Sequence, residues 1–249
     1  MTGDSALQRA GRACLATATA LVGWHLIVLL TGAPSFILPG PLDVARALND
    51  NAVLLLTQTG FSALNLLQGL ALGVVLGIAT ALNLALSPAT RLFLRPVLIF
   101  AQAVPVFALA PVITLWLGYG APSKIVMVAL VTYFPIASAF FDGLMRLPTG
   151  LGDLAQTSGA GPLRRLIHLQ VPNALPALAS GLRLSAIYAP LAVVIGEWVG
   201  SSRGLGHLML MANGRGQTDL MFASLMVLAL LSLSLWAAIE TLARRFLTR

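Results

Sequence analysis

Three histidines, one cysteine and eight carboxylates are the side chains with which this sequence could perform acid–base or metal chemistry. His25, His168 and His207 are far apart and Cys14 stands alone, so no spacing typical of a zinc site is present. The phosphate-binding pattern Gly-x-x-x-x-Gly-Lys-Ser/Thr is also absent. We therefore expect no metal centre, no bound cofactor and no catalytic residues in this chain, and we predict that it is not an enzyme.

Two ionisable residues, Arg183 and Glu197, instead lie within long apolar stretches. Charged side chains in such stretches are rare, and they tend to face a helix-bundle interior or an aqueous path. Glu197, beside Trp198, is expected either to meet a solute in such a path or to pair with nearby Arg203. The candidate pathway-lining residues are Gln102, Pro105, Tyr188, Glu197 and Trp198.

These residues are embedded in a chain with the composition of a membrane protein. Hydrophobic residues make up 58% of its 249 positions and charged residues 9%, whereas a soluble domain has roughly 45–50% and about 25%. Six apolar stretches are each long enough to cross a hydrocarbon layer of roughly 30 Å as a helix. We predict an all-α polytopic membrane protein, a single transmembrane domain over residues 1–249, with spans at residues 13–30, 63–86, 97–117, 125–141, 175–199 and 222–239.

The basic residues between the spans predict which side of the membrane each loop faces, because cytoplasmic loops carry an excess of Lys and Arg. One set of loops holds Arg9, Arg12, Arg91, Arg95, Arg146, Arg164, Arg165, Arg244, Arg245 and Arg249, and the other holds only Arg46, Lys124, Arg203 and Arg215. Both termini and the loop at residues 142–174 are therefore predicted to be cytoplasmic. The net charge of +7 is dispersed between apolar stretches, so we expect no nucleic-acid partner.

The second span carries the pattern Gly69-x-x-x-Gly73-x-x-x-Gly77. Small residues at this spacing line one helical face and let another backbone approach closely. The partner is either another helix of the same bundle or a second copy of the chain. The third and fifth spans carry interior prolines, which kink helices and are typical of a static bend or of a pore-lining helix, at Pro105, Pro111, Pro176 and Pro190.

The loop at residues 142–174 is predicted to form a helix, a turn and a second helix. Residues 151–158 are compatible with a helix, the run Gly159-Ala160-Gly161-Pro162 interrupts it, and a second helix can start at Pro162. Val171-Pro172 is expected to end that helix before the next span. Such a compact projection either docks into a groove of a soluble partner or is a solvated connector.

The same loop resembles a known motif. Asp153-Leu154-Ala155-Gln156-Thr157-Ser158-Gly159, followed after nine residues by Leu169-Gln170-Val171-Pro172, is similar to the EAA motif of bacterial ABC importer permeases, Glu-Ala-Ala-x3-Gly-x9-Ile-x-Leu-Pro. The spacing and the glycine are intact, whereas Asp153 replaces the glutamate and Leu154 the first alanine. The resemblance implies that residues 142–174 form the loop that couples a permease to its ATPase.

The resemblance extends over nearly the whole chain. It includes the glycine-spaced second span and the segments at residues 38–41, 105–111, 116–120, 123–125, 196–200 and 204–206. Together these segments resemble the nitrate, sulfonate, taurine and thiamine-precursor group of permeases. Residues 105–119 and 196–221 are most similar to permeases for hydroxymethylpyrimidine, which implies a thiamine pyrimidine precursor as the solute, with alkanesulfonates, taurine, nitrate or riboflavin-like solutes as alternatives.

The family resemblance also implies partners and a location. The expected assembly has two copies of this chain, two cytosolic ATPase subunits and one extracytoplasmic binding protein in the inner membrane of a bacterium. ATP and magnesium are expected on the ATPase subunits and not on this chain. The ATPase-coupling residues implied by the motif and its surroundings are Asp153, Ala155, Gly159, Ala160, Gly161, Pro162, Leu163, Arg164 and Arg165.

Other readings of the same chain are possible. A secondary transporter or a channel shares the composition and the spans, but it needs an ion or proton site at membrane depth, for which only Arg183 and Glu197 are available. The first span, preceded by Arg9 and Arg12, could be a cleaved signal peptide, although its apolar run continues to Leu30. Both readings are weaker than that of an importer permease with six spans.

Overall fold

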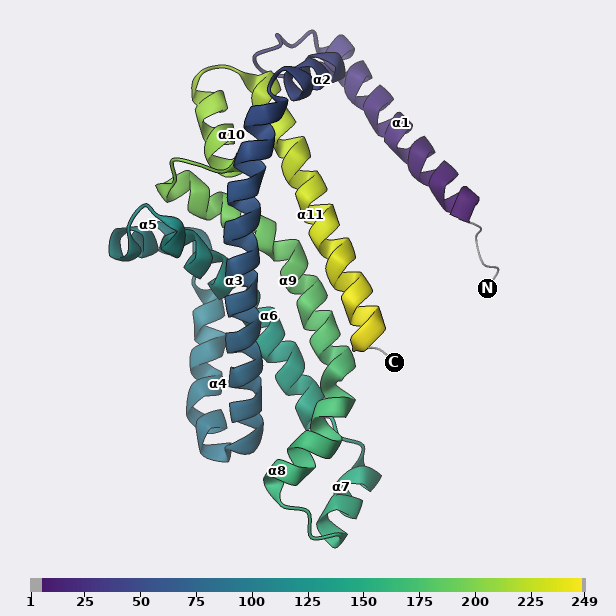
Figure 1. Cartoon of the computed structure of the whole chain (residues 1–249), viewed down its shortest axis with the longest axis vertical. Helices are drawn as coiled ribbons and strands as arrows, with labels where there is room; N and C mark the ends of the chain where they lie inside the picture. Colours follow the sequence, from purple (N-terminus) through teal and green to yellow (C-terminus); the bar gives the residue numbers. More distant parts are fainter. Residues whose placement is uncertain (1–5, 248–249) are drawn as a thin grey trace.

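The computed structural model describes residues 6–247, apart from a few side chains within helices, and this part of the chain is all-α as predicted. Figure 1 shows an elongated bundle with short helices at both ends. The helices are α1 (Ala6–Thr31), α2 (Pro41–Asp50), α3 (Ala52–Leu86), α4 (Pro88–Ala103), α5 (Val106–Leu117), α6 (Ala121–Met145), α7 (Thr149–Thr157), α8 (Pro162–Arg165), the π-helical turn η1 (Leu166–Gln170), α9 (Val171–Gly200), α10 (Leu205–Gly214) and α11 (Thr218–Phe246).

Helix α6 lies between α3 and α9, and these three helices form the centre of the bundle. The glycine face of α3 lies against α6: a Cβ atom on Gly69 would be 2.5 Å from the Cβ atom of Val128, and one on Gly77 would be 2.9 Å from Cγ2 of Ile136. Between them, a Cβ atom on Gly73 would overlap the Thr132 hydroxyl. The glycine pattern therefore serves packing within one chain, which decides between the two partners that the sequence left open.

The contact between α6 and α9 uses small residues in the same way. A Cβ atom on Gly143 of α6 would lie 2.6 Å from the Cβ atom of Ala177, and one on Gly181 of α9 would lie 2.8 Å from the carbonyl oxygen of Pro135. In addition, the buried Ser185 hydroxyl donates a hydrogen bond of 2.8 Å to the carbonyl oxygen of Thr132. Close backbone approach of this kind stabilises helix pairs in lipid, where the hydrophobic effect does not drive helices together.

Four helical segments are long and apolar enough to cross a membrane: α3, α6, the continuous run from Pro162 to Gly200, and α11. Shorter apolar stretches at Leu15–Thr31 and Val106–Leu117 correspond to the first span and to part of the third. On α11, large apolar side chains such as Leu230 and Leu233 are about two-thirds exposed. An outward apolar surface of this kind suits a lipid environment, in agreement with the predicted polytopic membrane protein.

The predicted third span at residues 97–117 is wrong in one respect, because it is not a single helix. Helix α4 ends at Ala103, and α5 starts at Val106 and projects to one side of the bundle (Figure 1). Val104 and Pro105 have extended backbones with ψ near 120°. A residue that precedes proline is pushed out of the helical region by the proline ring, so Pro105 breaks the helix where a kink was expected.

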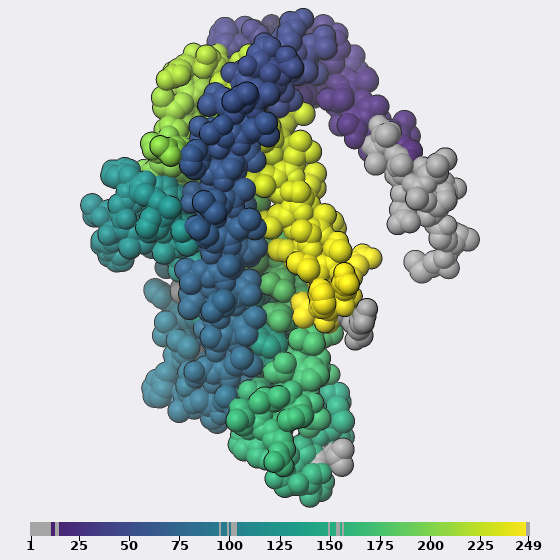
Figure 2. Space-filling view, in the orientation of Figure 1, coloured from purple at the N-terminus to yellow at the C-terminus, as the bar shows by residue number. Residues whose placement is uncertain are grey.

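Helix α1 diverges from the rest of the molecule. Its ribbon meets α2 at one end and leaves the bundle toward the N-terminus (Figure 1), and the space-filling view shows the same separation (Figure 2). The ring of Trp24 stacks on that of Phe222 of α11 at 5.8 Å between centroids. The apolar side chains of α1, such as Leu15 at 70% exposure and Leu29 at 64%, are left uncovered by this chain.

Candidate functional site

Helices α7 and α8 and the turn between them form a projection at one end of the bundle, which we call the knob (Thr149–Arg165) (Figure 1). At the turn, Gly159 adopts a φ of +65° and the amide of Ala160 donates a hydrogen bond of 3.0 Å to the carbonyl oxygen of Ala155. A positive φ is easily adopted by glycine and strained for other residues. The helix, the glycine turn and the second helix starting at Pro162 therefore agree with the sequence prediction.

The predicted coupling residues are all in the knob, and most of them are open to solvent. Leu163 is 58% exposed, Arg164 is exposed and Arg165 is half-buried, whereas Ala155 is buried. Gly159, Gly161 and Pro162 are exposed. The side chain of Asp153 lies outside the described part of the structure. An apolar side chain and an arginine on an exposed short helix are suitable for docking into a groove of another protein.

The sequence predicted that Val171-Pro172 would end the second helix, and this prediction is wrong. The chain is helical without interruption from Pro162 to Gly200, with the π-helical turn Leu166–Gln170 before Pro172. A π-turn changes the hydrogen-bond register, and such turns often occur at functional sites. Pro172 lies at the start of α9, directly after this π-helical turn. The knob is therefore directly continuous with α9, which ends beside the start of α10 (Figure 1).

Two sets of hydrogen bonds lie beside the base of the knob. Arg91 of α4 donates hydrogen bonds of 3.1 and 3.2 Å to the carbonyl oxygens of Leu84 and Ala85 at the end of α3, and the amide of Asn173 donates one of 3.0 Å to the carbonyl oxygen of Arg146. Between the α3–α4 turn and the knob lies an open cleft of about 260 Å³, which has Arg91, Arg165 and Gln170 among its lining residues. The hydrogen bond from Asn173 therefore joins the start of α9 to the residue that follows α6.

The candidate pathway residues do not form one cluster in this chain. Pro105 is exposed at the break between α4 and α5, and Tyr188 and Trp198 on α9 are 41% and 44% exposed. The side chain of Gln102 lies outside the described part of the structure. Glu197, in contrast, is fully buried. Whether these residues line a transport path is therefore still a prediction.

Glu197 does not pair with Arg203, so this expectation is wrong. Its carboxylate accepts a hydrogen bond of 2.8 Å from the Ser62 hydroxyl of α3 and one of 2.7 Å from the backbone amide of Gly206. Arg203 lies instead over the ring of Phe61, 4.9 Å from its centroid. Sequence reasoning missed Ser62 and Gly206 as partners. Only the glycines of Gly204-Leu205-Gly206 indicated that something must approach this turn closely.

Arg183 also has a partner that the sequence did not indicate. Its guanidinium pairs with the Glu240 carboxylate of α11, which also accepts a hydrogen bond of 2.5 Å from Arg244. The side chains of Arg183 and Glu240 are 29% and 16% exposed. A paired charge is less costly at membrane depth than a single one, so this group joins α9 to α11.

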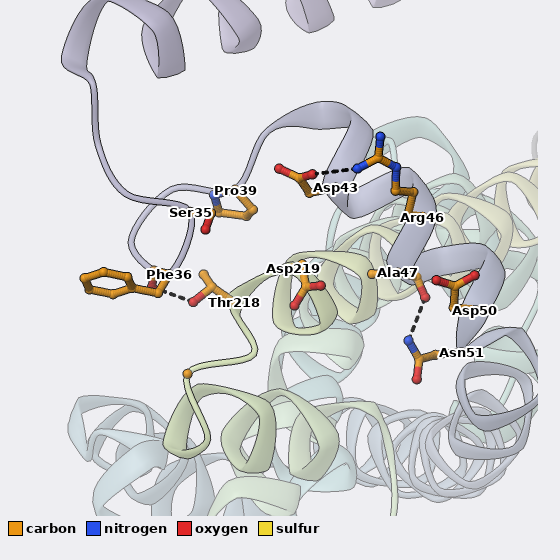
Figure 3. Close-up of a pocket in the computed structure, with 11 residues that line it drawn as sticks. Ser35, Phe36, Pro39, Asp43, Arg46, Ala47, Asp50, Asn51, Thr218 and Asp219 are labelled. Atoms are coloured by element: carbon orange, nitrogen blue, oxygen red, sulfur yellow. Dashed lines mark hydrogen bonds and ion pairs between the residues drawn. The ribbon is translucent and has the colours of Figure 1, made fainter.

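The end opposite the knob carries an open polar cleft of about 450 Å³ between α2 and the start of α11 (Figure 3). Its lining includes the carboxylates of Asp50 and Asp219 and an exposed ion pair of 3.4 Å between Asp43 and Arg46. The Thr218 hydroxyl donates a hydrogen bond of 2.6 Å to the carbonyl oxygen of Phe36 and so joins the start of α11 to the α1–α2 connection. The sequence did not predict this cleft.

Comparisons with known proteins show that this chain is similar to permease subunits of ABC transporters. Residues 73–248 match the family described as binding-protein-dependent transport system inner membrane component. A probable ABC transporter permease protein of Haemophilus influenzae is 46% identical over 91% of this chain and 93% of its own length. The formylaminopyrimidine transport permease protein ThiX of Halalkalibacterium halodurans is 33% identical, with 89% of each chain covered. The riboflavin transport system permease protein RibX of Chloroflexus aurantiacus is 36% identical, over 90% and 84%.

The fold has a solved counterpart. A chain from the MetNI methionine ABC transporter in inward-facing conformations superimposes with a TM-score of 0.65 and 22% sequence identity. The match covers 77% of this chain and 95% of the other. At this level of identity the similarity establishes the fold alone, which is that of a type I importer permease.

Proposed function

This chain belongs to the family of binding-protein-dependent transport system inner membrane components and is an ABC importer permease subunit, and we propose that it forms the membrane pathway of an ATP-driven importer. The proposed assembly has two copies of this chain, two ATPase subunits that carry ATP and magnesium, and one extracytoplasmic binding protein. Two identical permease subunits would place the solute path on or near a two-fold axis, which is the commonest symmetry of oligomers.

One observation carries the proposal: the helix that starts at Pro162 in the exposed knob continues without a break to Gly200, where α9 meets α10. Its 39 residues span roughly 60 Å at about 1.5 Å per residue. When ATP brings the ATPase subunits together, they would move the two knobs, and the movement would pass along α9 to the opposite end. The path would then change from open on the knob side to open on the other side.

The energy for this exchange has to come from the nucleotide. Moving an equilibrium between two conformations from 1:99 to 99:1 requires about 5.5 kcal/mol of differential binding. The described residues contain only a few ionisable groups within the spanning helices, and those of α9 are paired or hydrogen-bonded with other groups of the chain. This arrangement favours an energy source outside the chain over an ion gradient.

We propose that the knob side is cytosolic, with both termini on that side. The basic residues support this orientation, because ten of the fourteen that lie outside the predicted spans are in the loops and terminal segments on that side. The binding protein would then meet the opposite end, where α2, α10 and the polar cleft of Figure 3 are exposed. This end has the open surface that a docked protein requires.

For the solute we propose a pyrimidine precursor of thiamine. Residues 105–119 and 196–221 support this choice by their resemblance to hydroxymethylpyrimidine permeases, and ThiX is named for formylaminopyrimidine transport. A riboflavin-like solute is the alternative, because RibX is also similar over 90% of this chain. Sulfonates, taurine and nitrate complete the set of solutes to compare.

Reconstitution tests the proposal. Tagged permease is purified from membranes, the subunits that purify with it are identified, and the complex is placed in liposomes with ATP inside and solute-loaded binding protein outside. We expect ATP hydrolysis to rise when loaded binding protein is added, together with uptake of radiolabelled hydroxymethylpyrimidine. Uptake that persists without an ATPase subunit and stops with a protonophore would refute the proposal. Calorimetry of the binding protein with hydroxymethylpyrimidine, riboflavin, taurine and nitrate tests the choice of solute separately.

A further inference from the structure

The junction between α9 and α10 contains two fully buried ionisable residues whose role the proposed function does not explain. Glu197 lies in the last turn of α9 and is 0% exposed, and Lys124 lies in the first turn of α6 and is 1% exposed. Burying either charge without partners would cost several kcal/mol. Both residues have hydrogen-bond partners, and these partners show which parts of the molecule they join.

Lys124 holds the end of α9. Its ammonium donates one hydrogen bond to the carbonyl oxygen of Gly200, the last residue of that helix, and another of 2.7 Å to the carbonyl oxygen of Tyr119 in the α5–α6 turn. The last carbonyl groups of a helix have no partner within the helix and carry partial negative charge, so a cation is favourable there. Lys124 therefore fastens α9 to α6 and to the end of α5.

Glu197 holds the start of α10. The first amides of a helix also have no partner within the helix and carry partial positive charge. In α10 these amides are satisfied by side chains from two other helices: Gly206 donates to Glu197, Leu205 donates to the Ser62 hydroxyl at 2.8 Å, and Gly204 donates to the Gln58 side chain at 2.6 Å. Because Ser62 in turn donates to Glu197, the carboxylate links α3, α9 and α10.

Two glycines make this arrangement possible. Gly204 has a φ of +106°, and a Cβ atom there would overlap the Glu197 carboxylate. A Cβ atom on Gly206 would lie 3.0 Å from an oxygen of the same carboxylate. A side chain at either position would push Glu197 away from the amides it binds. Glu197 and the turn Gly204-Leu205-Gly206 are therefore in direct contact, and the small size of both glycines is needed for it.

We propose that Glu197 and Lys124 are positioning residues of the transport cycle, which keep the ends of α3, α6, α9 and α10 together as one rigid unit while the knob moves. We call this unit the α9–α10 clasp (Gln58, Ser62, Lys124, Glu197, Gly200, Gly204, Leu205 and Gly206). The inference rests on the proposed function. A force applied at Pro162 can reorient the opposite end of the pathway only if α9 is firmly attached there. Without the clasp, α10 and the end of α9 would shift relative to α3, and the displacement would be lost in local rearrangement.

The test uses the complete complex of permease, ATPase and binding protein in liposomes. Glu197→Gln keeps the size of the side chain but cannot accept hydrogen bonds from both Ser62 and Gly206. We expect basal ATP hydrolysis to be kept, while solute transported per ATP hydrolysed falls about tenfold, as the loss of a hydrogen bond to a charged group suggests. Ser62→Ala keeps the charge, removes one bond and should give a smaller fall. Ser201→Ala is the matched control, because Ser201 bonds only within its own loop to Arg203.

A spectroscopic measurement separates a positioning role from a merely stabilising one. Spin labels are placed at two exposed positions, Leu56 on α3 and Asn213 on α10, in a Cys14→Ser background and diluted with unlabelled chains. In the parent complex the distance distribution should be narrow and have the same maximum with and without ATP. In Glu197→Gln and Ser62→Ala it should broaden, in complexes that still elute as intact assemblies.

Two outcomes would overturn the inference. One is a change of the maximum between nucleotide states in the parent complex, because the clasp would then not be rigid. The other is that Glu197→Gln or Ser62→Ala transports as much solute per ATP hydrolysed as the unmodified protein and keeps a narrow distribution of spin-label distances. Failure of the proposed function is distinct, since the parent complex itself would then show no hydrolysis coupled to uptake, and the inference would fall with it.

Discussion

The guanidinium of Arg183 on α9 pairs with the carboxylate of Glu240 on α11, and this ion pair joins two spanning helices. Arg244, one turn after Glu240, donates to the other carboxylate oxygen at 2.5 Å. The pair lies nearer the knob end of α9 than Glu197 does. Helix α9 is thus fixed to α11 at Arg183 and to α3, α6 and α10 at its far end.

Removing one partner of this pair should lower the thermal stability of the permease. Arg183→Gln leaves a carboxylate with only Arg244, and Glu240→Gln leaves a partly buried guanidinium without its counter-charge. Because each single variant already breaks the same contact, we expect the double variant to lose less than the sum of the two. The measurement is the unfolding midpoint of the four proteins in one detergent. Additive losses would show that the two side chains are not energetically coupled.

Enlarging the central glycine of α3 should force α3 and α6 apart. Gly73→Leu would drive a side chain into Thr132 of α6, and such overpacking costs about 1–3 kcal/mol or more. Gly60→Leu is the matched control, because nothing lies within 4 Å of a Cβ atom at Gly60 of the same helix. We expect a lower unfolding midpoint and less folded protein for Gly73→Leu only. Equal effects of both variants would contradict the packing described here.

Valine at the knob turn should uncouple ATP hydrolysis from the solute. Gly159 has a φ of +65°, which a β-branched residue adopts only with strain, so Gly159→Val would change the direction of the turn that precedes α8. We expect the protein to insert in the membrane normally while stimulation of the ATPase by loaded binding protein is lost. Gly150→Val, with open space around it and no positive φ, should keep most of the stimulation. Full stimulation in Gly159→Val would remove the docking role of the knob.

The orientation of the chain can be measured with single cysteines, because Cys14 is the only native one and can be replaced by serine. Leu163→Cys in the knob and Asn213→Cys in α10 are both at exposed positions. A maleimide that does not cross membranes should label Asn213→Cys in intact cells and Leu163→Cys only in inverted vesicles. The reverse pattern would place the knob outside the cell and refute the proposed coupling to a cytosolic ATPase.

The sequence by itself determined the class of the protein. Apolar stretches long enough to cross lipid require helices, because lipid offers no hydrogen bonds to backbone groups. The knob was also predictable, since Gly159 and Pro162 act on their own backbone and need no distant partner. Pro105 was recognised as a point of distortion, although local chemistry did not say whether the helix would bend or break.

Only the tertiary structure decided which helices meet and which polar groups pair. Ser62 and Glu197 are 135 positions apart, and no local pattern relates them, so the sequence indicated the nearer Arg203 as a partner. The glycine face of α3 could have packed on any apolar helix or on a second chain, because small residues favour close approach without selecting a partner. The physical reason is the same in both cases: local spacing sets the conformation of a segment, whereas contacts between segments depend on the packing of the whole bundle.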